Sequence, residues 1–319
     1  MQSQADPPQL SIVLLNYRTG DMTVECLQGI LDECAQCDIR VETIIVDNAS
    51  GDGSDEVIAA YLESTNIDTG VMRLVRSPVN GGFSAGNNVG IKAAKSDFIL
   101  LLNSDTLLTP GCLTALIECA HKSPAAGIIG AQLMDADGTK QYSHFNYISP
   151  MSEFLVRAGI GFFDRIFRHY IIRKPIQSTQ ITNPADWVSF AGVLVRRDLI
   201  DAIGLMDEGY FLYFEDTDYC QMARKAGWGV LQATQSLIIH KRGGSGPVKQ
   251  IRKAGKRLPR YYYESRARYF KKHYGGTLGL ILTNLMIYLA YCVAAASRIY
   301  KTRRLFNVEK EWRDIWIGL

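Results

Sequence analysis

The stretch Phe98-Ile-Leu-Leu-Leu102 is wholly apolar, and Asn103-Ser104-Asp105 follows it directly. A short apolar run of this kind is typical of a strand that is buried on both faces. A carboxylate at the end of such a strand suits Mg²⁺ or Mn²⁺, which take few protein ligands and leave positions open for phosphate and water. Asn, Ser and Asp also favour simple turns. The stretch alone leaves a metal site and a turn as open alternatives.

The segments on either side repeat this pattern. Further strands are predicted at residues 10–15, 41–46, 71–75 and 126–134. Apolar residues at helical spacing lie between them, which predicts a mainly parallel, doubly wound α/β sheet. Ligands of such sheets bind at the carboxyl ends of the strands. Because Asp47, Asn80 and Asp105 each follow a strand, we expect them to share one edge of the sheet.

A glycine-rich segment opens one of the predicted helices. It reads Asn80-Gly-Gly-Phe-Ser-Ala-Gly86-Asn87-Asn88-Val-Gly90. Glycine lets the backbone approach a ligand closely, and a helix N-terminus offers free N–H groups to phosphate. The spacing matches neither the dinucleotide fingerprint nor the P-loop. A plain glycine turn therefore explains the segment equally well.

Three acids within four residues follow an apolar segment in Phe211-Leu-Tyr-Phe-Glu215-Asp216-Thr217-Asp218. Ionised carboxylates are costly to bury without partners. The cluster therefore indicates that a cation or a proton-bearing group meets the acids there. The alternative is the acid-rich N-terminus of a helix, which is predicted over residues 216–226.

Composition and charge place the chain among ordinary globular proteins. It has 319 residues, 47% of them hydrophobic and 21% charged, which excludes wholesale disorder. The net charge of +3 is unevenly spread, because ten Lys or Arg residues and one acid, Glu264, lie between Lys249 and Lys272. Such a block indicates contact with phosphates, either of nucleic acid or of anionic lipid. The seven cysteines show no disulfide framework, which fits a reducing compartment.

The C-terminal part differs from the rest. Residues 276–297 form a charge-free run that is long enough to cross a bilayer, with basic residues on both flanks. A helix lying in the membrane interface and a helix packed on the catalytic domain are the alternatives. Membrane contact is favoured because the basic block and the apolar run are adjacent. We therefore divide the chain into a catalytic domain, residues 1–248, and a membrane-associated helical tail, residues 249–319.

Five motifs in order carry a family resemblance. They are Ser11-Ile-Val-Leu-Leu-Asn-Tyr17, Val46-Asp-Asn-Ala-Ser50, the segment 80–90, Leu102-Asn-Ser-Asp105 and Phe214-Glu-Asp216. Together they resemble the family 2 inverting glycosyltransferases of the GT-A fold, a Rossmann-like, doubly wound mixed sheet. The nearest subgroup includes bacterial rhamnosyltransferases of cell-surface polysaccharide assembly. The similarity covers residues 10–245.

The resemblance implies a role for each matching residue. The residues expected near the nucleotide are Asn16, Tyr17, Asp47, Asn80, Asn87 and Asn103. Asp105 and His240 correspond to ligands of Mg²⁺ or Mn²⁺. Asp216 corresponds to the catalytic base, with Glu215 beside it, and Trp187 and Asp218 correspond to acceptor-side residues. Asn103 is a departure, because it stands where the D-x-D motif has its first acid.

The implied reaction is a metal-dependent sugar transfer with inversion. Asp216 would take the proton of an acceptor hydroxyl as its oxygen displaces the nucleoside diphosphate in one step. The expected donor is dTDP-L-rhamnose, with UDP-hexoses next, and the acceptor is a saccharide or a polyprenyl-diphosphate-linked glycan. The expected location is the cytoplasmic face of the inner membrane, at an anionic surface, as a peripheral or single-span protein. The oligomeric state stays open, a homodimer included.

Three alternatives remain at this stage. A processive synthase is disfavoured because Gln221-Met-Ala-Arg224 is followed by Lys225 rather than Trp. A sugar-phosphate nucleotidyltransferase should show a glycine- and arginine-rich loop after the first strand, and residues 16–20 have too few glycines. A non-enzymatic scaffold or nucleic-acid binder could use the tyrosines at 261–263 for stacking. Nucleic acid is disfavoured because the three acids Asp47, Asp105 and Asp216 would repel phosphate unless a metal is bound.

Overall fold

The structure is a computed structural model that describes residues 7–65, 71–176, 181–241, 248–297 and 308–319. Two segments that mattered for the sequence interpretation lie outside these ranges. One is the stretch 242–245 that follows His240, and the other is the basic stretch 298–304 that follows the apolar run.

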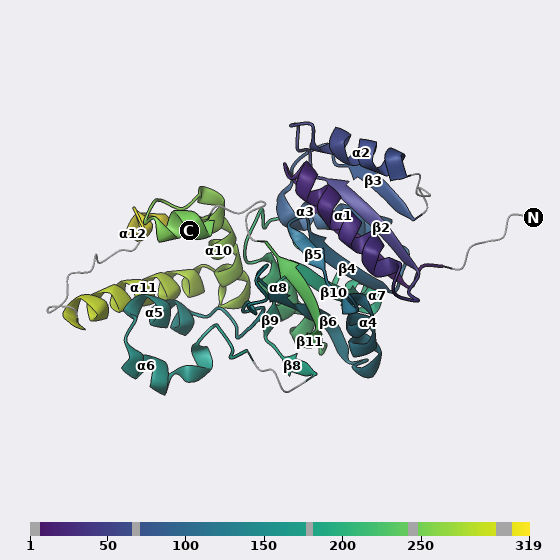
Figure 1. Ribbon diagram of the computed structural model, residues 1–319. Helices are drawn as coiled ribbons and strands as arrows, with labels where there is room; N and C mark the ends of the chain where they lie inside the picture. The colour runs from purple at the N-terminus through teal and green to yellow at the C-terminus, as the bar shows by residue number, and fades with distance from the viewer. Residues whose placement is uncertain (1–6, 66–70, 177–180, 242–247, 298–307) are drawn as a thin grey trace, which may run out of the picture.

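A mixed sheet of nine strands forms the centre of the described chain (Figure 1). The order is β3-β2-β1-β4-β10-β6-β11-β5, and β8 pairs with β11 beside this path. The strands β3, β2, β1 and β4 are parallel, whereas β10 is antiparallel to both β4 and β6. The pair β7–β9 forms a separate small sheet. The strands are β1 (Leu10–Asn16), β2 (Val41–Asp47), β3 (Met72–Arg76), β4 (Phe98–Asn103), β5 (Thr106–Leu108), β6 (Ala126–Met134), β7 (His144–Phe145), β8 (Thr182–Pro184), β9 (Trp187–Val188), β10 (Gly192–Arg196) and β11 (Gly229–His240).

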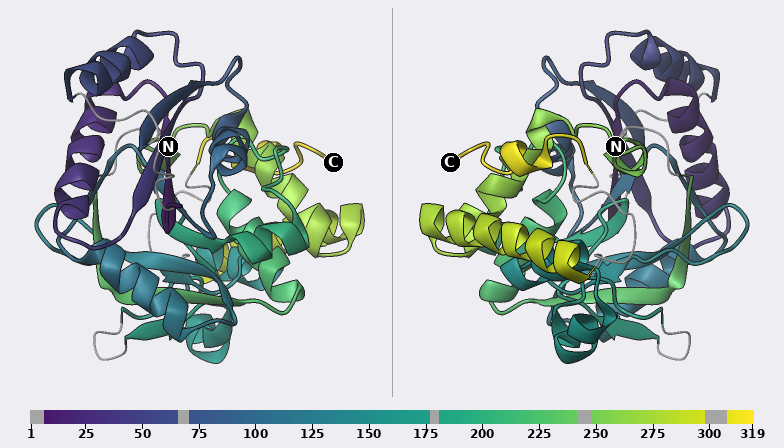
Figure 2. Two further views of the ribbon diagram at one scale, coloured as in Figure 1. Left: turned by 90° about the vertical axis from the view of Figure 1, so that its right-hand side faces the viewer. Right: turned by 90° about the vertical axis from the view of Figure 1, so that its left-hand side faces the viewer.

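Helices cover both faces of the sheet. The helices are α1 (Gly20–Cys34), α2 (Ser54–Thr65), α3 (Gly82–Ala93), α4 (Cys112–Lys122), α5 (Pro150–Ala158), α6 (Gly161–Ile166), the 3-10 helix η1 (Arg168–Tyr170), α7 (Arg197–Ile203), α8 (Glu215–Lys225), α9 (Val248–Lys253), α10 (Arg260–His273), α11 (Gly276–Ser297) and α12 (Glu311–Asp314). In the left panel of Figure 2 the purple α1 and the yellow-green α11 lie on opposite sides of the sheet.

The alternation of side chains along β1 shows how the two faces are filled. Leu10, Ile12 and Leu14 belong to the core under α1, α2 and α4, whereas Val13 belongs to the core under α3, α7 and α8. Successive side chains of a strand point to opposite faces, so a wholly apolar strand fits only a sheet that is covered twice. The doubly wound architecture predicted from the apolar runs is therefore confirmed.

A helical lobe lies beside the sheet, where α10 and α11 meet α5 and α6 (Figure 1). On α10, Tyr269 and Phe270 are buried against Tyr210 and Phe214, which precede α8. Helix α11 begins and ends at the bounds predicted for the apolar run. The division of the chain at residue 248 stays a prediction.

Residues 138–185 contain much of the contact surface for α11, chiefly in α5. Helix α5 begins with a reciprocal cap, because the Ser149 hydroxyl accepts from the Ser152 N–H and the Ser152 hydroxyl accepts from the Ser149 N–H in turn. A cap of this type is recognisable in a sequence when Ser or Thr is followed three residues later by Glu or Gln. Here Ser takes the second position, and Pro150 follows the cap. The signal was therefore weak in the sequence.

Candidate active site

The first part of the site lies where β1 and β2 end. Asn16 and Asp47 are in register, and the Asn16 side-chain amide donates to the Asp47 carboxylate at 2.7 Å. The backbone N–H and hydroxyl of Ser50 donate to the same carboxylate, at 3.1 and 2.5 Å. Asp47 is thus buried and held by three donors, while Tyr17 beside it is partly exposed with the Arg18 guanidinium over its ring. The arrangement fixes a carboxylate at the strand ends, as predicted.

The glycine-rich segment packs against the protein itself. Gly82 has a φ of +87°, and a Cβ there would come within 2.2 Å of the Phe211 carbonyl oxygen. At Gly86 and Gly90 a Cβ would collide with Leu15 and Val13 of β1. These glycines therefore allow α3 to approach β1 and the chain before α8. This close approach to protein was not foreseen.

The three asparagines of this segment have different partners. Asn80 accepts a hydrogen bond from the Asn48 amide at 3.0 Å, which ties the segment to the residue after Asp47. Asn87 is buried and donates to the Phe83 carbonyl within α3, so its predicted contact with a nucleotide stays a prediction. Asn88 was not singled out from the sequence. Its amide nitrogen donates to the Met206 carbonyl, and its amide oxygen accepts from the Met206 N–H.

The second part of the site lies at the end of β4. Asp105 is buried, and its carboxylate lies 3.5 Å from the Nε2 atom of His240. The pairing of β5 with β11 brings them together, because His240 lies opposite Thr106 in the ladder. The Lys241 N–H donates to the Asp105 carbonyl at 2.9 Å. Sequence reasoning paired these two residues across 135 positions through the family resemblance alone, and the sheet brings them into contact.

The tautomer of His240 decides what this pair can hold. The Gln141 amide nitrogen donates to Asp135 and to the His240 carbonyl, so the amide oxygen of Gln141 faces His240 Nδ1 at 3.4 Å. An acceptor at Nδ1 places the proton there and leaves a lone pair on Nε2. That lone pair and the Asp105 carboxylate then face each other. A cation between two such acceptors relieves their repulsion, so the donor set fits a divalent metal.

Asn103 and Ser104, at the same edge of the sheet, make contacts within the protein. Asn103 donates its backbone N–H to the Ala191 carbonyl, and its own carbonyl accepts from Thr106. The Ser104 hydroxyl lies 2.7 Å from the Thr19 hydroxyl. In the described part of the chain, no group of three or more His, Cys, Asp or Glu residues gathers around a common point. Asp105 and His240 would thus be the residues that hold a metal at this edge.

The third part of the site is the start of α8. Tyr213 and Phe214 have φ values of +72° and +71°, a conformation that non-glycine residues rarely adopt. Two such residues in a row are costly unless their surroundings enforce them, and outliers of this kind concentrate at functional sites. These two residues directly precede α8 and set the direction in which its first turn begins. In that turn Asp216 is partly exposed, and its carboxylate accepts a hydrogen bond from the Thr217 N–H at 2.7 Å.

Glu215 is in a very different position from its neighbour. It is buried, and its Oε2 atom has no hydrogen-bond partner among the described residues. Burial, reinforced by the nearby Asp216, raises the pKa of Glu215 well above its usual value. Burial therefore disfavours the charged form of Glu215.

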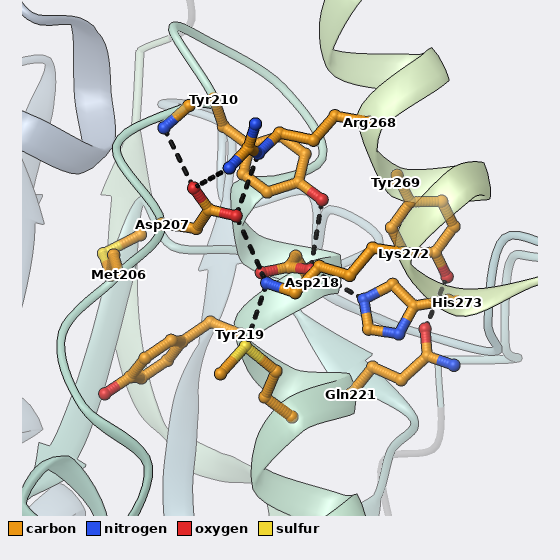
Figure 3. A network of polar contacts seen from close by, with 12 residues as sticks. Met206, Asp207, Tyr210, Asp218, Tyr219, Gln221, Arg268, Tyr269, Lys272 and His273 are labelled. Atoms are coloured by element: carbon orange, nitrogen blue, oxygen red, sulfur yellow. Dashed lines mark hydrogen bonds and ion pairs between the residues drawn. The ribbon is translucent and has the colours of Figure 1, made fainter. Parts of the chain in front are cut away.

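Asp218 lies on the side of α8 that faces α10 (Figure 3). Its buried carboxylate accepts from the Tyr210 hydroxyl at 3.1 Å, from Lys272 at 2.8 Å and from His273 Nε2 at 2.6 Å. The expected acceptor-side role of Asp218 stays a prediction. Three donors surround its carboxylate, and two of them, Lys272 and His273, belong to α10. Sequence reasoning did not single out His273, because a lone His at a helix end carries no motif.

Trp187 on β9 is partly buried and rigidly held. Its ring stacks on Phe145 with centroids 4.1 Å apart, and its Nε1–H donates to the Asn146 carbonyl at 2.9 Å. Helix α8 packs against β9. Trp187 therefore lies close to α8, and its contact with an acceptor sugar stays a prediction.

A chain of contacts joins these parts at one edge of the sheet. The Asn48 amide donates to the Gly82 carbonyl at 3.0 Å, and the Phe83 N–H donates to the Phe211 carbonyl at 2.7 Å. The segment after Asp47, the start of α3 and the segment before α8 are thus neighbours. Asn16 of β1 and Asp105 after β4 border the same edge, because β1 pairs with β2 and β4. The sheet order and the placement of these acids agree with the GT-A architecture that the family resemblance implies.

The family itself follows from comparison with known proteins. The family described as glycosyl transferase family 2 matches residues 11–200, more than half of the chain. The chain belongs to glycosyltransferase family 2, and the predicted enzyme class is confirmed.

Relatives and solved structures extend this result. The N-acetylglucosaminyl-diphospho-decaprenol L-rhamnosyltransferase of Mycobacterium tuberculosis is 27% identical over 223 residues, which are 64% of this chain and 68% of the relative. The mannosyltransferase PcManGT from Pyrobaculum calidifontis, solved with GDP-Man and Mn²⁺, has a TM-score of 0.57 at 13% identity and covers 94% of this chain and 77% of its own. GalNAc-T7, solved with UDP, GalNAc and Mn²⁺, has a TM-score of 0.57 at 14% identity, with coverages of 83% and 51%. At these identities the two structures show the shared fold.

Proposed function

We propose that this glycosyltransferase moves a sugar from a nucleoside-diphosphate sugar to a lipid-linked glycan, with inversion and without polymerisation. The observation that carries the proposal is the placement of Asp216 at the start of α8, beside the edge that bears Asp47 and Asp105. The names of the solved structures, with GDP-Man, UDP and Mn²⁺, support a nucleotide donor and a divalent metal. The name of the mycobacterial relative supports rhamnose as donor sugar and a polyprenyl-diphosphate acceptor.

The residues present can perform this reaction. Asp47 and Asn16 form a fixed polar surface for the base, with the partly exposed Tyr17 beside them. Asp105 and His240 would hold Mg²⁺ or Mn²⁺, which when bound supplies positive charge for the departing diphosphate. Asp216 takes the proton of the acceptor hydroxyl as the new glycosidic bond forms.

Two substitutions of nearly equal volume test the assignment of roles. Asp216→Asn should lower kcat by about 10²-fold or more, because the general base is lost, while binding of the nucleoside diphosphate with Mn²⁺ is retained. Asp105→Asn should weaken that Mn²⁺-dependent binding. Calorimetry with UDP and dTDP, alongside detection of released nucleoside diphosphate, measures both effects. Near wild-type turnover of Asp216→Asn would contradict the proposal, and release of pyrophosphate would indicate a nucleotidyltransferase.

The donor can be identified by its effect on stability. A ligand at a hundred times its dissociation constant raises the free energy of unfolding by roughly 2.7 kcal/mol. Thermal unfolding with Mn²⁺ and a panel of nucleotide sugars should therefore single out the cognate donor. We expect dTDP-L-rhamnose to give the largest shift, with UDP-hexoses next.

A further inference from the structure

Helix α11 exposes a row of leucines and buries two polar side chains, together with Leu280 and Ile287, on the side that faces the protein. Leu278, Leu282, Leu285 and Leu289 recur at intervals of four, three and four residues, and each is between 51% and 64% exposed. Residues at this spacing lie along one face of a helix. Thr283 and Asn284 on the opposite face are fully buried. A core helix of a water-soluble protein would show the reverse arrangement, so the leucine face is made for an apolar surrounding.

Buried charges fix the other face of α11 to the protein. The Asn284 amide oxygen accepts from Arg266 at 2.8 Å, and its nitrogen donates to the Ile315 carbonyl at 2.9 Å. Arg266 in turn pairs with Glu153 of α5 at 2.8 Å. All three side chains are buried. Lipid on every side of α11 would require this ion pair to separate or to enter hydrocarbon, and both are costly.

A second network repeats the attachment about two turns further along the helix. The Tyr291 hydroxyl contacts Glu311, whose carboxylate also pairs with Arg157 of α5 at 2.8 Å. Attractive contacts on both halves of the helix therefore hold it alongside α5 over its length. The helix is long and apolar enough to cross a membrane, but its buried polar side matches a helix that lies flat on one.

The neighbouring helix α6 supplies a basic and aromatic surface in the same lobe (Figure 1). Phe162 and Ile166, four residues apart, are 67% and 53% exposed. Arg165 of α6 and Arg168 of the following η1 are also exposed, and they are interleaved with these apolar residues along the chain. Exposed apolar side chains interleaved with arginine are typical of segments that lie at the interface of an anionic membrane.

We propose that the exposed faces of α11 and α6 dock together on an anionic lipid surface, with α11 in the plane of the interface and not across it. Charge complementarity favours lipid over a second copy of the chain. Two copies joined through this lobe would bring Arg165 and Arg168 near their own equivalents, whereas phosphate headgroups neutralise them. The inference does not depend on the transfer reaction, because the exposed leucines of α11 and the arginines have no part in the proposed chemistry.

Vesicle flotation of the full chain tests the proposal. Vesicles of equal parts phosphatidylglycerol and phosphatidylcholine should carry the wild-type protein, and vesicles of phosphatidylcholine alone should carry much less. The double variant Leu282→Gln and Leu285→Gln should lower partitioning at least about tenfold, because two leucines no longer enter the acyl region. Arg165→Gln with Arg168→Gln should lower it roughly tenfold on the anionic vesicles. Val57→Gln with Val71→Gln, equally exposed apolar positions on the other lobe, is the matched control and should float like the wild type.

Two further measurements distinguish in-plane lipid binding from a membrane-spanning helix and from a dimer contact. Alkaline carbonate should release the protein from membranes, and retention in the pellet would overturn the in-plane arrangement. Light scattering in lipid-free solution should give the same mass for the wild type and the Leu282/Leu285 variant. A wild-type dimer that the variant breaks, with flotation unchanged, would assign the face to a second copy and overturn the proposal. All variants should bind UDP with Mn²⁺ as the wild type does, which shows that they are folded.

Discussion

Glu215 and Asp216 are adjacent in the chain, yet their carboxyl groups have different surroundings. Asp216 is partly exposed, whereas Glu215 is buried with one oxygen that lacks a hydrogen-bond partner among the described residues. Helical geometry turns neighbouring side chains by about 100°, so consecutive acids at a helix start necessarily face different ways. The pair illustrates how one acid motif can place two carboxyl groups in different surroundings.

We predict that Glu215→Gln is at least as stable as the wild type above pH 5 and retains activity within about tenfold. The pKa of Glu215 is raised in the folded state, so the folded protein holds a proton that the unfolded chain loses above about pH 4.3. Stability from this residue is therefore full at lower pH and falls as the pH rises. The amide in the Glu215→Gln variant does not titrate, so the decrease in stability with rising pH is absent there. Thermal unfolding of both proteins across pH 4–8 measures this difference.

The activity of the same variant distinguishes the two carboxyl groups. Glu215→Gln keeps the size of the side chain at a buried position and removes only its ability to ionise, whereas Asp216→Asn removes the proposed base. Loss of turnover in both variants would show that Glu215 works as an ion, contrary to its burial. The sequence could predict that acids gather here, but which of them is buried depends on the packing of α10 against the preceding segment, 211–214. That contact joins residues some fifty positions apart and leaves no local signal.

At the scale of elements, Asp218 connects α8 to α10. Lys225 donates to Nδ1 of His273 at 3.0 Å, so Nε2 carries the hydrogen that reaches the Asp218 carboxylate at 2.6 Å. A buried carboxylate with three donors is a strong local attachment, and the removal of one partner leaves the rest unsatisfied. The helix that carries Asp216 is thereby held by the C-terminal part of the chain.

We predict a coupling energy of roughly 1–3 kcal/mol between Asp218 and His273. Asp218→Ala, His273→Ala and the double variant form the thermodynamic cycle, measured as free energies of unfolding in urea. The exposed pair Arg260 and Glu264, one turn apart on α10, is the control, and its coupling should be small because solvent screens it. Equal coupling in the two cycles would contradict the view that the buried contact anchors α8.

Strands and helices with a regular apolar pattern were predicted closely. Helices whose apolar residues pack against a distant part of the chain were not. The strands 10–15 and 41–46 and the helix 276–297 agree with the structure to within a residue, because predominantly apolar segments have visible ends in the sequence. An apolar segment does not show which side of the helix faces the protein. Since α11 is apolar almost all round, its sequence could not show that Asn284 faces Arg266. Helices α5 and α6 were missed because their apolar residues pair with α11, far along the chain.

At the scale of the whole molecule, the C-terminal helices are packed into the protein. Tyr210 and Phe214 of the catalytic part are covered by Tyr269 and Phe270 of α10. Glu153 of α5 is paired with Arg266, and burial would raise the pKa of this acid if Arg157 and Arg266 did not lower it to about 2. Both arrangements cross the boundary at residue 248. A sequence-based division placed there because composition changes does not reveal such contacts.

We predict that a chain ending at residue 248 does not fold cooperatively. Removal of the C-terminal helices would expose aromatic side chains worth about 1.5–3 kcal/mol each, a loss that adds to the unpaired charge of Glu153. Together these losses approach the 5–15 kcal/mol of stability typical of a whole protein. Calorimetry and near-ultraviolet circular dichroism of the full and shortened chains measure the difference. A shortened chain that unfolds in one sharp transition at the temperature of the full protein would instead establish residues 1–248 as an independent domain. The membrane-docking helix would then be an appendage, and its loss should leave binding of UDP with Mn²⁺ unchanged.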